Sequence, residues 1–283
     1  MNANELVANV SGLVTLPDVY LRISRLLDDP DAGSDEIARA IAQDPAFTLR
    51  LLKVANSVLY RLPSAVGTVS RAVSVIGTSQ VRNLALSMSV AKSFAGLPNT
   101  LVSMENFWRH SLLCALIARL LARQARRCDP DAVFTAGLLH DIGELVIFNR
   151  CPEQARQALS SVIDNDDELP VFAAEREALG FDHAAVGGAL ARQWNLPPLL
   201  EECIAFHHDI AGATLHPREV AIVHIANSLA EMAEIGTLDP ADVAPIDPLA
   251  WERTGLEDDC IEPAVAEARA AVDDLQKLFT EAP

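Results

Sequence analysis

The strongest constraint on the fold is a series of helix-start signals that recurs along the chain. Asp44-Pro45 and Asp129-Pro130 each place a capping side chain before a proline at the first helical position. Ser34 precedes an acidic first turn, Asp35 and Glu36, which suits the positive end of a helix dipole. The sequence contains no convincing run of β-branched residues that alternate with polar ones. Short connections between amphipathic helices therefore predict an all-α fold, a multi-helix bundle.

Further signals mark the ends of individual helices. Thr68 opens a short helix whose apolar residues recur at helical spacing, and Gly77 closes it. We expect Thr78 to cap the helix that follows and Asp182 to cap a helix whose first turn holds His183. A last amphipathic helix is expected after Pro263, with apolar positions at Val265, Ala268, Val272, Leu275 and Phe279.

The pattern divides the chain into three parts that together form one unit. Residues 12–97 hold several short helices and no histidine, and a natural break follows in the stretch Gly96-Leu97-Pro98-Asn99. Residues 98–234 hold longer helices and every histidine. Residues 235–283 hold a loop rich in proline and aspartate, from Asp239 to Pro248, and the last helix. We expect that helix either to dock on the bundle or to form a dimer contact, so the sequence leaves open whether the protein is a homo-oligomer.

Charge and hydropathy exclude some functions. The 283 residues are half apolar and carry a net charge of −17, with a predicted pI of about 4.7. This balance argues against nucleic acid and against an anionic membrane surface as partners. The most apolar run, Leu112 to Ala122, is interrupted by Arg119 and is too short to span a bilayer.

The start of the chain and its cysteines point to the cytoplasm. Residues 1–10 show no secretory signal. The five cysteines form no C-x-x-C pair, and we expect them to be reduced thiols, with Cys114 and Cys203 in the core.

All seven histidines fall between His110 and His224. Imidazole and carboxylate are the ligands of borderline divalent metals, and helical bundles build metal sites from side chains on several helices. The alternative is that some of these histidines are hydrogen-bonded core residues. The series nevertheless predicts a site for Zn, Fe, Ni or Mn. Its candidate ligands are His110, His140, Asp141, His183, His207 and His208.

Local patterns suggest how these residues meet. His110 lies on an apolar stripe and should point inward. The segment Ala136 to Gly143 is rich in small residues, which allow close helix packing around His140 and Asp141. Neighbours on a helix point about 100° apart, so this pair can flank one metal; a buried His–Asp hydrogen bond is the alternative. His208 is a ligand or a support of a ligand, and His216, before Pro217, is the best surface candidate.

Several motifs resemble the HDOD family of bacterial signalling domains, relatives of the HD metal-dependent phosphohydrolases. The resemblance covers roughly Leu13 to Glu231. It rests on Leu16-Pro17, Asp44-Pro45-Ala46-Phe47, Leu51-Leu52-Lys53-Val54-Ala55-Asn56-Ser57 and the run from Ala72-Val73 to Gly77. The histidine series resembles the ligand order of the HD superfamily, which includes a cyclic-dinucleotide phosphodiesterase branch. The resemblance implies a degenerate HD-type helical core and adds Asn227 as the last ligand position.

The chain departs from the HD enzymes at four places. Asn227 stands where the last ligand is an aspartate, and Asn106 where the phosphodiesterase branch tends to have a glutamate. Glu144 replaces a phosphate-binding lysine, and Asp209 to Gly212 replaces a Gly-Tyr-Pro signature. A neutral amide is a poorer ligand than a carboxylate, and a carboxylate near a substrate phosphate repels it.

Basic residues that would hold a phosphate look scarce. Arg123, Arg126 and Arg127 lie roughly 20–25 Å along the helix from His110. Arg109 and Arg192 read as solvated charges.

The resemblance implies a regulatory module that acts by contact with a signalling protein, with a bound metal adjusting its shape. Only about eleven residues precede the HDOD-like region, so we expect the input to come from another chain or a small molecule. Two alternatives stay open: a phosphohydrolase acting on a nucleotide or cyclic dinucleotide, and a metal-free scaffold. Asn56 is expected to be a buried amide that bonds helix ends rather than a ligand contact.

Overall fold

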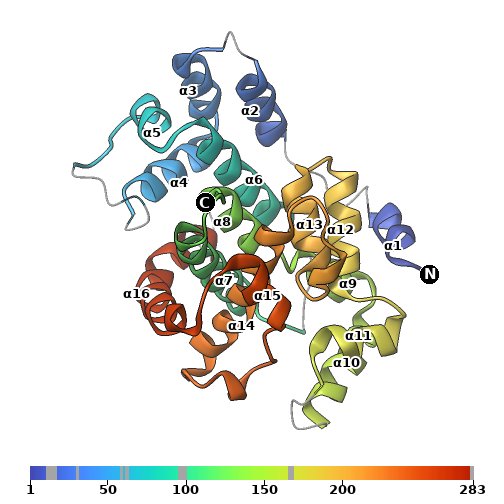
Figure 1. Cartoon of the computed structure of the whole chain (residues 1–283). Coiled ribbons are helices and arrows are strands. Elements are labelled where there is room, and N and C mark those ends of the chain that lie inside the picture. Colours follow the sequence, from blue (N-terminus) through green and yellow to red (C-terminus); the bar gives the residue numbers. More distant parts are fainter. Residues whose placement is uncertain are drawn as a thin grey trace. The chain divides into compact units, whose positions relative to one another are not determined.

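The computed structural model describes residues 1–10, 18–29, 32–57, 60, 64–94, 101–164 and 169–280. Within these ranges the chain is helical and has no strand, which confirms the all-α prediction. The expected break at residues 96–99 and the Leu16-Pro17 motif lie outside the described residues. The helices are α1 (Ala3–Val10), α2 (Asp18–Asp28), α3 (Ser34–Ala42), α4 (Pro45–Ala55), α5 (Val69–Ile76), α6 (Thr78–Phe94), α7 (Met104–Gln124), α8 (Pro130–Leu139), α9 (Ile142–Arg150), α10 (Pro152–Asp164), α11 (Val171–Leu179), α12 (His183–Gln193), α13 (Pro198–Phe206), α14 (Pro217–Ile235), α15 (Pro248–Thr254) and α16 (Ile261–Thr280), with 3-10 turns η1 (Ile210–Gly212), η2 (Pro240–Asp242) and η3 (Asp258–Cys260) (Figure 1).

The chain forms two compact units. The first comprises Met1–Leu13 with Leu97–Ala270, and the second comprises Val14–Gly96 with Ala271–Pro283. In the second unit, α6 packs against α2, α4 and α5, and α3 packs against α2, α4 and α5. Ile23, Ile41, Leu51 and Phe94 are fully buried there, so this unit has an apolar core of its own. The expected three-part division of the chain stays a prediction.

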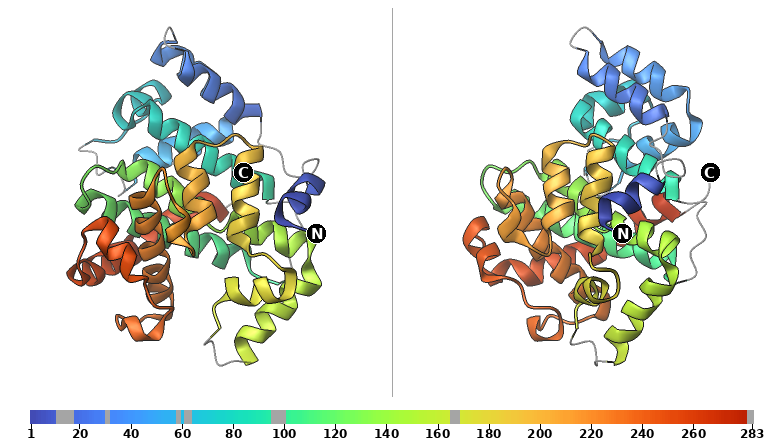
Figure 2. Two further views of the ribbon diagram at one scale, coloured as in Figure 1. Left: turned by 45° about the vertical axis from the view of Figure 1, so that its right-hand side comes forward. Right: turned by 90° about the vertical axis from the view of Figure 1, so that its right-hand side faces the viewer.

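The first unit is built around α7, which packs against α8 and α14. Gly137 makes the close approach of α7 and α8 possible, since a Cβ there would lie 3.0 Å from Cα of Ala115. Arg119 crosses the same interface to Asp131 at 2.7 Å. Helices α12 and α13 pack together, α9 contacts α12, and α1 lies against α12 and α9 (Figure 2). No helix in the described ranges is both long and apolar enough to cross a bilayer.

Most helix ends follow the predicted caps. The side chains of Asp44, Thr68, Asp129 and Asp182 each accept a hydrogen bond from a backbone N–H in the first turn that follows. Gly77 closes α5 in a left-handed conformation that an L side chain resists, with φ of 87°.

Two predicted starts are displaced. Thr78 is the first residue of α6, because the carbonyl of Gly77 already accepts from Val81 N–H, and α16 begins at Ile261, two residues before Pro263. Proline fits the first turn of a helix because it has no N–H to leave unsatisfied there.

The prediction for Asn56 was half wrong. Its side chain bonds backbone as expected: Nδ2 donates to Leu52 O and Val66 O, and Oδ1 accepts from Val66 N–H. The residue is nevertheless exposed. Asn56 ends α4 at the surface, where its amide holds the returning loop at Val66.

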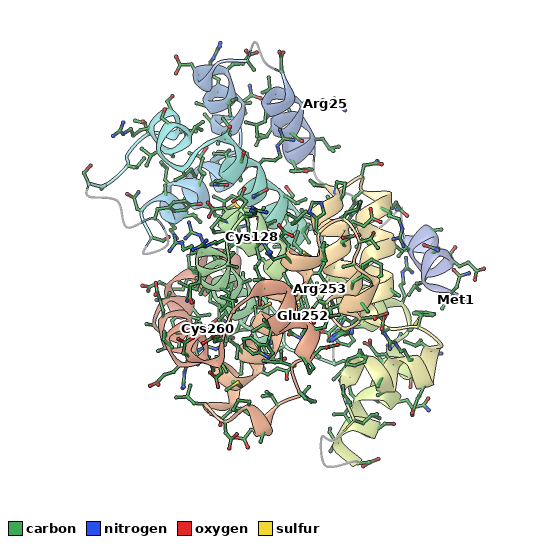
Figure 3. The ribbon with its side chains drawn as sticks, viewed as in Figure 1. Met1, Arg25, Cys128, Glu252, Arg253 and Cys260 are labelled. Carbon is green, nitrogen blue, oxygen red and sulfur yellow. The ribbon has the colours of Figure 1, made fainter. Side chains whose placement is uncertain are left out.

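The five cysteines are free, and Cys114 and Cys203 are core residues as predicted. Cys128 lies between α7 and α8 and Cys260 lies in η3, both labelled in Figure 3.

Candidate metal centre

Five segments of the first unit bring the predicted ligands to one place. His110 comes from α7, His183 is the first residue of α12, and Asn227 comes from α14. His207 and His208 follow the end of α13 directly. The side chains of His140 and His207 are fully buried. Every member of the predicted ligand set therefore contributes to a single cluster.

One local expectation needs correction. His140 and Asp141 do not lie on a continuous helix, because α8 ends at Leu139 and α9 begins at Ile142. Asp141 has φ of −97° and ψ of 11°, outside regular helix geometry. On a continuous helix the two side chains would point about 100° apart. The break lets both face one point, with 2.9 Å between His140 Nε2 and Asp141 Oδ2.

The carboxylate of Asp141 lies at the centre of the cluster. Its Oδ2 faces His140 Nε2 and, at 3.6 Å, His110 Nε2. Its Oδ1 faces Nε2 of His183 at 3.3 Å and Nε2 of His207 at 3.4 Å. Burial opposes ionisation, but the charge of His140 and the imidazole hydrogen bonds hold the pKa of Asp141 well below its usual range. One acid thus joins two ligand groups, with His110 and His140 on one side and His183, His207 and His208 on the other.

Three imidazoles are held in the orientation that a metal ligand needs. The Nδ1–H of His140 donates to Gly137 O at 2.7 Å, and the Nδ1–H of His207 donates to Ile204 O at 2.9 Å. The Nδ1–H of His183 donates to a carboxylate oxygen of Glu175 at 2.7 Å. Each ring therefore turns its Nε2 toward Asp141, so that a metal could replace any proton on that nitrogen, an arrangement typical of metal-binding histidines.

His207 gives a direct test of whether these residues fit a metal. Its Nε2 is buried and makes no hydrogen bond of good geometry within the described residues, although Asp141 Oδ1 lies 3.4 Å away. A buried polar atom without a partner costs about 1–3 kcal/mol. A divalent ion bound among Asp141, His183, His207 and His208 would satisfy that atom, so the residues fit the group.

His208 completes this side of the cluster. Its Nε2 lies 3.0 Å from His183 Nε2, and its ring stacks on Phe172 with centroids 4.3 Å apart. Two imidazole nitrogens bound to one metal at about 2.0–2.1 Å each can approach one another this closely. Burial lowers the pKa of His207 to about 4 and also lowers the pKa of His208. Both rings are therefore neutral at pH 7, the form that binds metal.

The other side of the cluster carries Asn227 and His110. Asn227 Oδ1 lies 2.8 Å from His110 Nε2 and 3.2 Å from His140 Nε2. His110 also donates from Nδ1 to Glu234 at 3.0 Å. Burial opposes a charge on His110, but the bond to Glu234 and the charges of Asp141 and Glu234 outweigh it and raise the pKa of His110 to about 9. Without metal, the protonated ring donates to both oxygens.

A second layer of contacts fixes the turn that carries His207 and His208. His224 donates from Nδ1 to His207 O at 2.7 Å, and its Nε2 accepts from Asp247 N–H at 3.0 Å. Arg253, labelled on α15 in Figure 3, donates to Ile210 O just beyond the turn. His224 is therefore a support and not a ligand.

Two further polar candidates, His216 and Arg192, have partners outside the cluster. The backbone N–H of His216 donates to Glu202, and Arg192 pairs with Glu201 at the surface. His216 is half-buried, so it is less exposed than the sequence predicted.

Three glutamates near the cluster were missed as partners. Glu175 on α11 accepts from both the backbone N–H and Nδ1 of His183, and Glu234 lies seven residues beyond Asn227 on α14. Glu144, which was expected only to repel phosphate, lies with Glu175 and His183 in a third group. Burial and the charge of Asp141 raise the pKa of Glu144 to about 8. The spacing of Glu234 from Asn227 was a usable signal, since residues seven apart on a helix share a face.

The chain resembles known proteins both in sequence and in fold. The model of the HDOD domain matches residues 13–210. An uncharacterized protein of Treponema pallidum (strain Nichols) is 28% identical over 215 residues, which are 75% of this chain and 40% of that protein. The chain thus spans about two fifths of the length of this curated relative.

Solved structures with the same fold include two that match nearly end to end. An HDOD domain protein with unknown function from Geobacter sulfurreducens is 28% identical with a TM-score of 0.76, and the match covers 96% of each chain. A protein described as a "putative phosphohydrolase" from Shewanella amazonensis SB2B is 23% identical with a TM-score of 0.78, over 99% of each chain.

Proposed function

The chain belongs to the HDOD domain family, and from this premise we propose that it is a metal-binding regulatory module. In this proposal a divalent transition metal binds at His110, His140, Asp141, His183, His207, His208 and Asn227. The metal stabilises one arrangement of the surrounding helices, and a signalling protein recognises that arrangement. The related HD phosphohydrolases are the enzymes whose site this one resembles.

One observation carries the metal-binding part. Three imidazoles have their Nδ1–H groups engaged and turn Nε2 toward a shared carboxylate, and one of these nitrogens is buried without a partner. A neutral His–Asp hydrogen-bond network would pair that nitrogen. The imidazole-rich donor set favours Zn, Fe, Ni or Mn over Mg or Ca.

Elemental analysis of protein purified without chelator tests this proposal. We expect one or two transition-metal ions per chain, because Asp141 faces two ligand groups. Asp141→Ala should lose most of the metal. A wild-type protein that stays metal-free, even after incubation with Zn²⁺ and Mn²⁺, would leave only the scaffold alternative.

Asn227→Asp offers a test in the opposite direction. A carboxylate at this position adds a charged oxygen beside His110 and His140, so the variant should bind metal more tightly. An unchanged affinity would count against Asn227 as a ligand.

A second candidate, a metal-dependent phosphohydrolase, is favoured by the two ligand groups that share Asp141, since two-metal sites activate water and stabilise phosphoryl oxygens. Against it stands the charge of the surroundings. Glu144 and Glu175 line one side, and the neighbouring cation Arg176 pairs with Asp182 at 2.6 Å. A binding module should not hydrolyse an activated phosphodiester with Mn²⁺ or Fe²⁺; an enzyme should do so and lose the rate in His140→Ala.

A further inference from the structure

Glu144 and Glu175 lie beside the imidazole cluster, close to the starts of α9 and α12. Glu144 is in the first turn of α9, Glu175 is on α11, and His183 begins α12. Gly143 makes this approach possible, because a Cβ there would lie 2.0 Å from His183 O. One ligand atom from each of Glu144, Glu175 and His183 lies within 4.8 Å of the other two.

The two oxygens of Glu175 are used very differently. Oε2 accepts from the backbone N–H of His183 at 2.8 Å and from its Nδ1 at 2.7 Å. Oε1 is buried and has no hydrogen-bond partner within the described residues, although Glu175 is only 1% exposed. Oε2 alone holds the His183 ring in its orientation. The burial of Oε1 without a partner therefore needs another explanation.

Without a cation, two carboxylates this close avoid repulsion by keeping one protonated, in agreement with the raised pKa of Glu144, whereas a bound cation would let both ionise. Of the neighbouring basic side chains, His183 donates from Nδ1 to Oε2 of Glu175, and the guanidinium of Arg176 binds Asp182 at 2.6 Å. Two oxygens bound to one hard cation at about 2.0–2.6 Å each are separated by at most about 5 Å. The spacing of Glu144 and Glu175 falls within that limit.

We propose that Glu144 and Glu175 form a separate, oxygen-lined binding position for a hard divalent cation of the Mg²⁺ or Mn²⁺ type. Carboxylate oxygens favour these ions, which keep several waters and need few protein ligands. The position differs in chemistry from the imidazole cluster and does not require that cluster to be filled. Glu175 touches both, since it holds His183 with one oxygen and the cation with the other.

A sequential metal titration tests this position. The imidazole cluster is first loaded with Co²⁺, weakly held Co²⁺ is removed by gel filtration, and the retained Co²⁺ is counted by elemental analysis. Mn²⁺ is then added, and free Mn²⁺ is measured by electron paramagnetic resonance. Wild-type protein should bind one further Mn²⁺ per chain, and Glu144→Gln should weaken this binding at least tenfold while retaining Co²⁺. Glu175→Gln should also lose the Mn²⁺.

Glu231→Gln is the matched control, because Glu231 is a half-buried glutamate on α14 whose charge acts on the same cluster. It should bind Mn²⁺ as the wild type does. Equal Mn²⁺ binding by Glu144→Gln and wild type would overturn the proposal, as would no Mn²⁺ uptake or the loss of both metals in Glu144→Gln. If Co²⁺ fails to bind, the imidazole-cluster proposal fails. The dependence of Mn²⁺ binding on Glu144 still tests the carboxylate pair, so the two proposals can be rejected independently.

Discussion

Asp141 shows how one side chain can organise several others. Four imidazole nitrogens lie within 3.6 Å of its two oxygens, and Asp141 belongs to both ligand groups. Asp141 occupies the N-cap position before α9, but its side chain makes no capping hydrogen bond to that helix. A carboxylate that could have accepted from the first-turn N–H groups is instead directed to the imidazoles, which is expected where function sets the geometry.

Metal uptake should release a proton from His110. In the metal-free protein the pKa of His110 is raised to about 9, so the ring is protonated at pH 7. A metal binds only the deprotonated ring, so affinity should rise with pH between about 7 and 9. Calorimetry at pH 7 in two buffers of different ionisation enthalpy measures the protons released.

Glu234→Gln provides the comparison for this measurement. It removes the charge that raises the pKa of His110, so fewer protons should be released at pH 7. Equal proton release by variant and wild type would rule out the Glu234–His110 pair as its source.

Glu202 should stabilise the fold in a pH-dependent way. Burial opposes ionisation, but backbone N–H groups of His216, Leu215 and Thr214 outweigh it and lower the pKa of Glu202. A lowered folded-state pKa stabilises the protein above the unfolded value near 4.5, and the effect is lost as pH falls through the folded value. At pH 7, Glu202→Gln should cost about 2 kcal/mol of unfolding free energy.

Urea denaturation from pH 7 down to about 3 tests this. The stability difference between wild type and Glu202→Gln should shrink as pH falls. A difference that stays constant over this range would contradict the role of the charge.

At the scale of helices, most starts were predictable from the sequence, but the break between α8 and α9 that positions His140 and Asp141 was not. Asp44, Asp129 and Asp182 cap helices as expected, because capping depends on residues three positions away at most. The break after Leu139 has no proline, and Gly143 comes only after the next helix has started. It depends on contacts with α12, far along the chain, which local patterns do not encode.

The same limit explains the glutamates. The histidine ligands were identifiable from their type and order, whereas Glu175 is one acid among many until the fold places it against His183.

Gly143→Ala should disrupt the packing of α9 against α12. The added Cβ would lie 2.0 Å from His183 O and 2.7 Å from Gly187 N, both backbone atoms. The helices must separate, at a cost of about 3 kcal/mol or more, and His183 moves with α12. We expect a lower melting temperature and at least tenfold weaker metal binding.

Gly67→Ala is the matched control, because a Cβ there meets nothing within 4 Å. Its melting temperature should stay near that of wild type. A Gly143→Ala protein with wild-type stability and metal content would show that α9 and α12 can adjust freely.

For the whole molecule, the decisive fact is that every proposed ligand belongs to one of the two compact units. The ligands lie between His110 and Asn227, inside the Leu97–Ala270 part of the first unit. A ligand that binds only the folded state stabilises it by RT ln(1 + [L]/Kd), or about 2.7 kcal/mol at one hundred times Kd. That stabilisation applies to the unit that holds the ligands.

Hydrogen exchange with and without Zn²⁺ should therefore change unevenly along the chain. Amides of α7, α8, α12 and α14 should exchange more slowly with metal, because each helix carries a ligand or leads directly into one. Amides of α3 to α6 should exchange at the same rate, since the second unit contributes no proposed ligand. If metal slowed exchange equally in both units, the two would unfold as one cooperative body. If it slowed exchange in neither, the cluster would not bind the ion tightly enough to bias the fold, and the regulatory proposal would lose its physical basis.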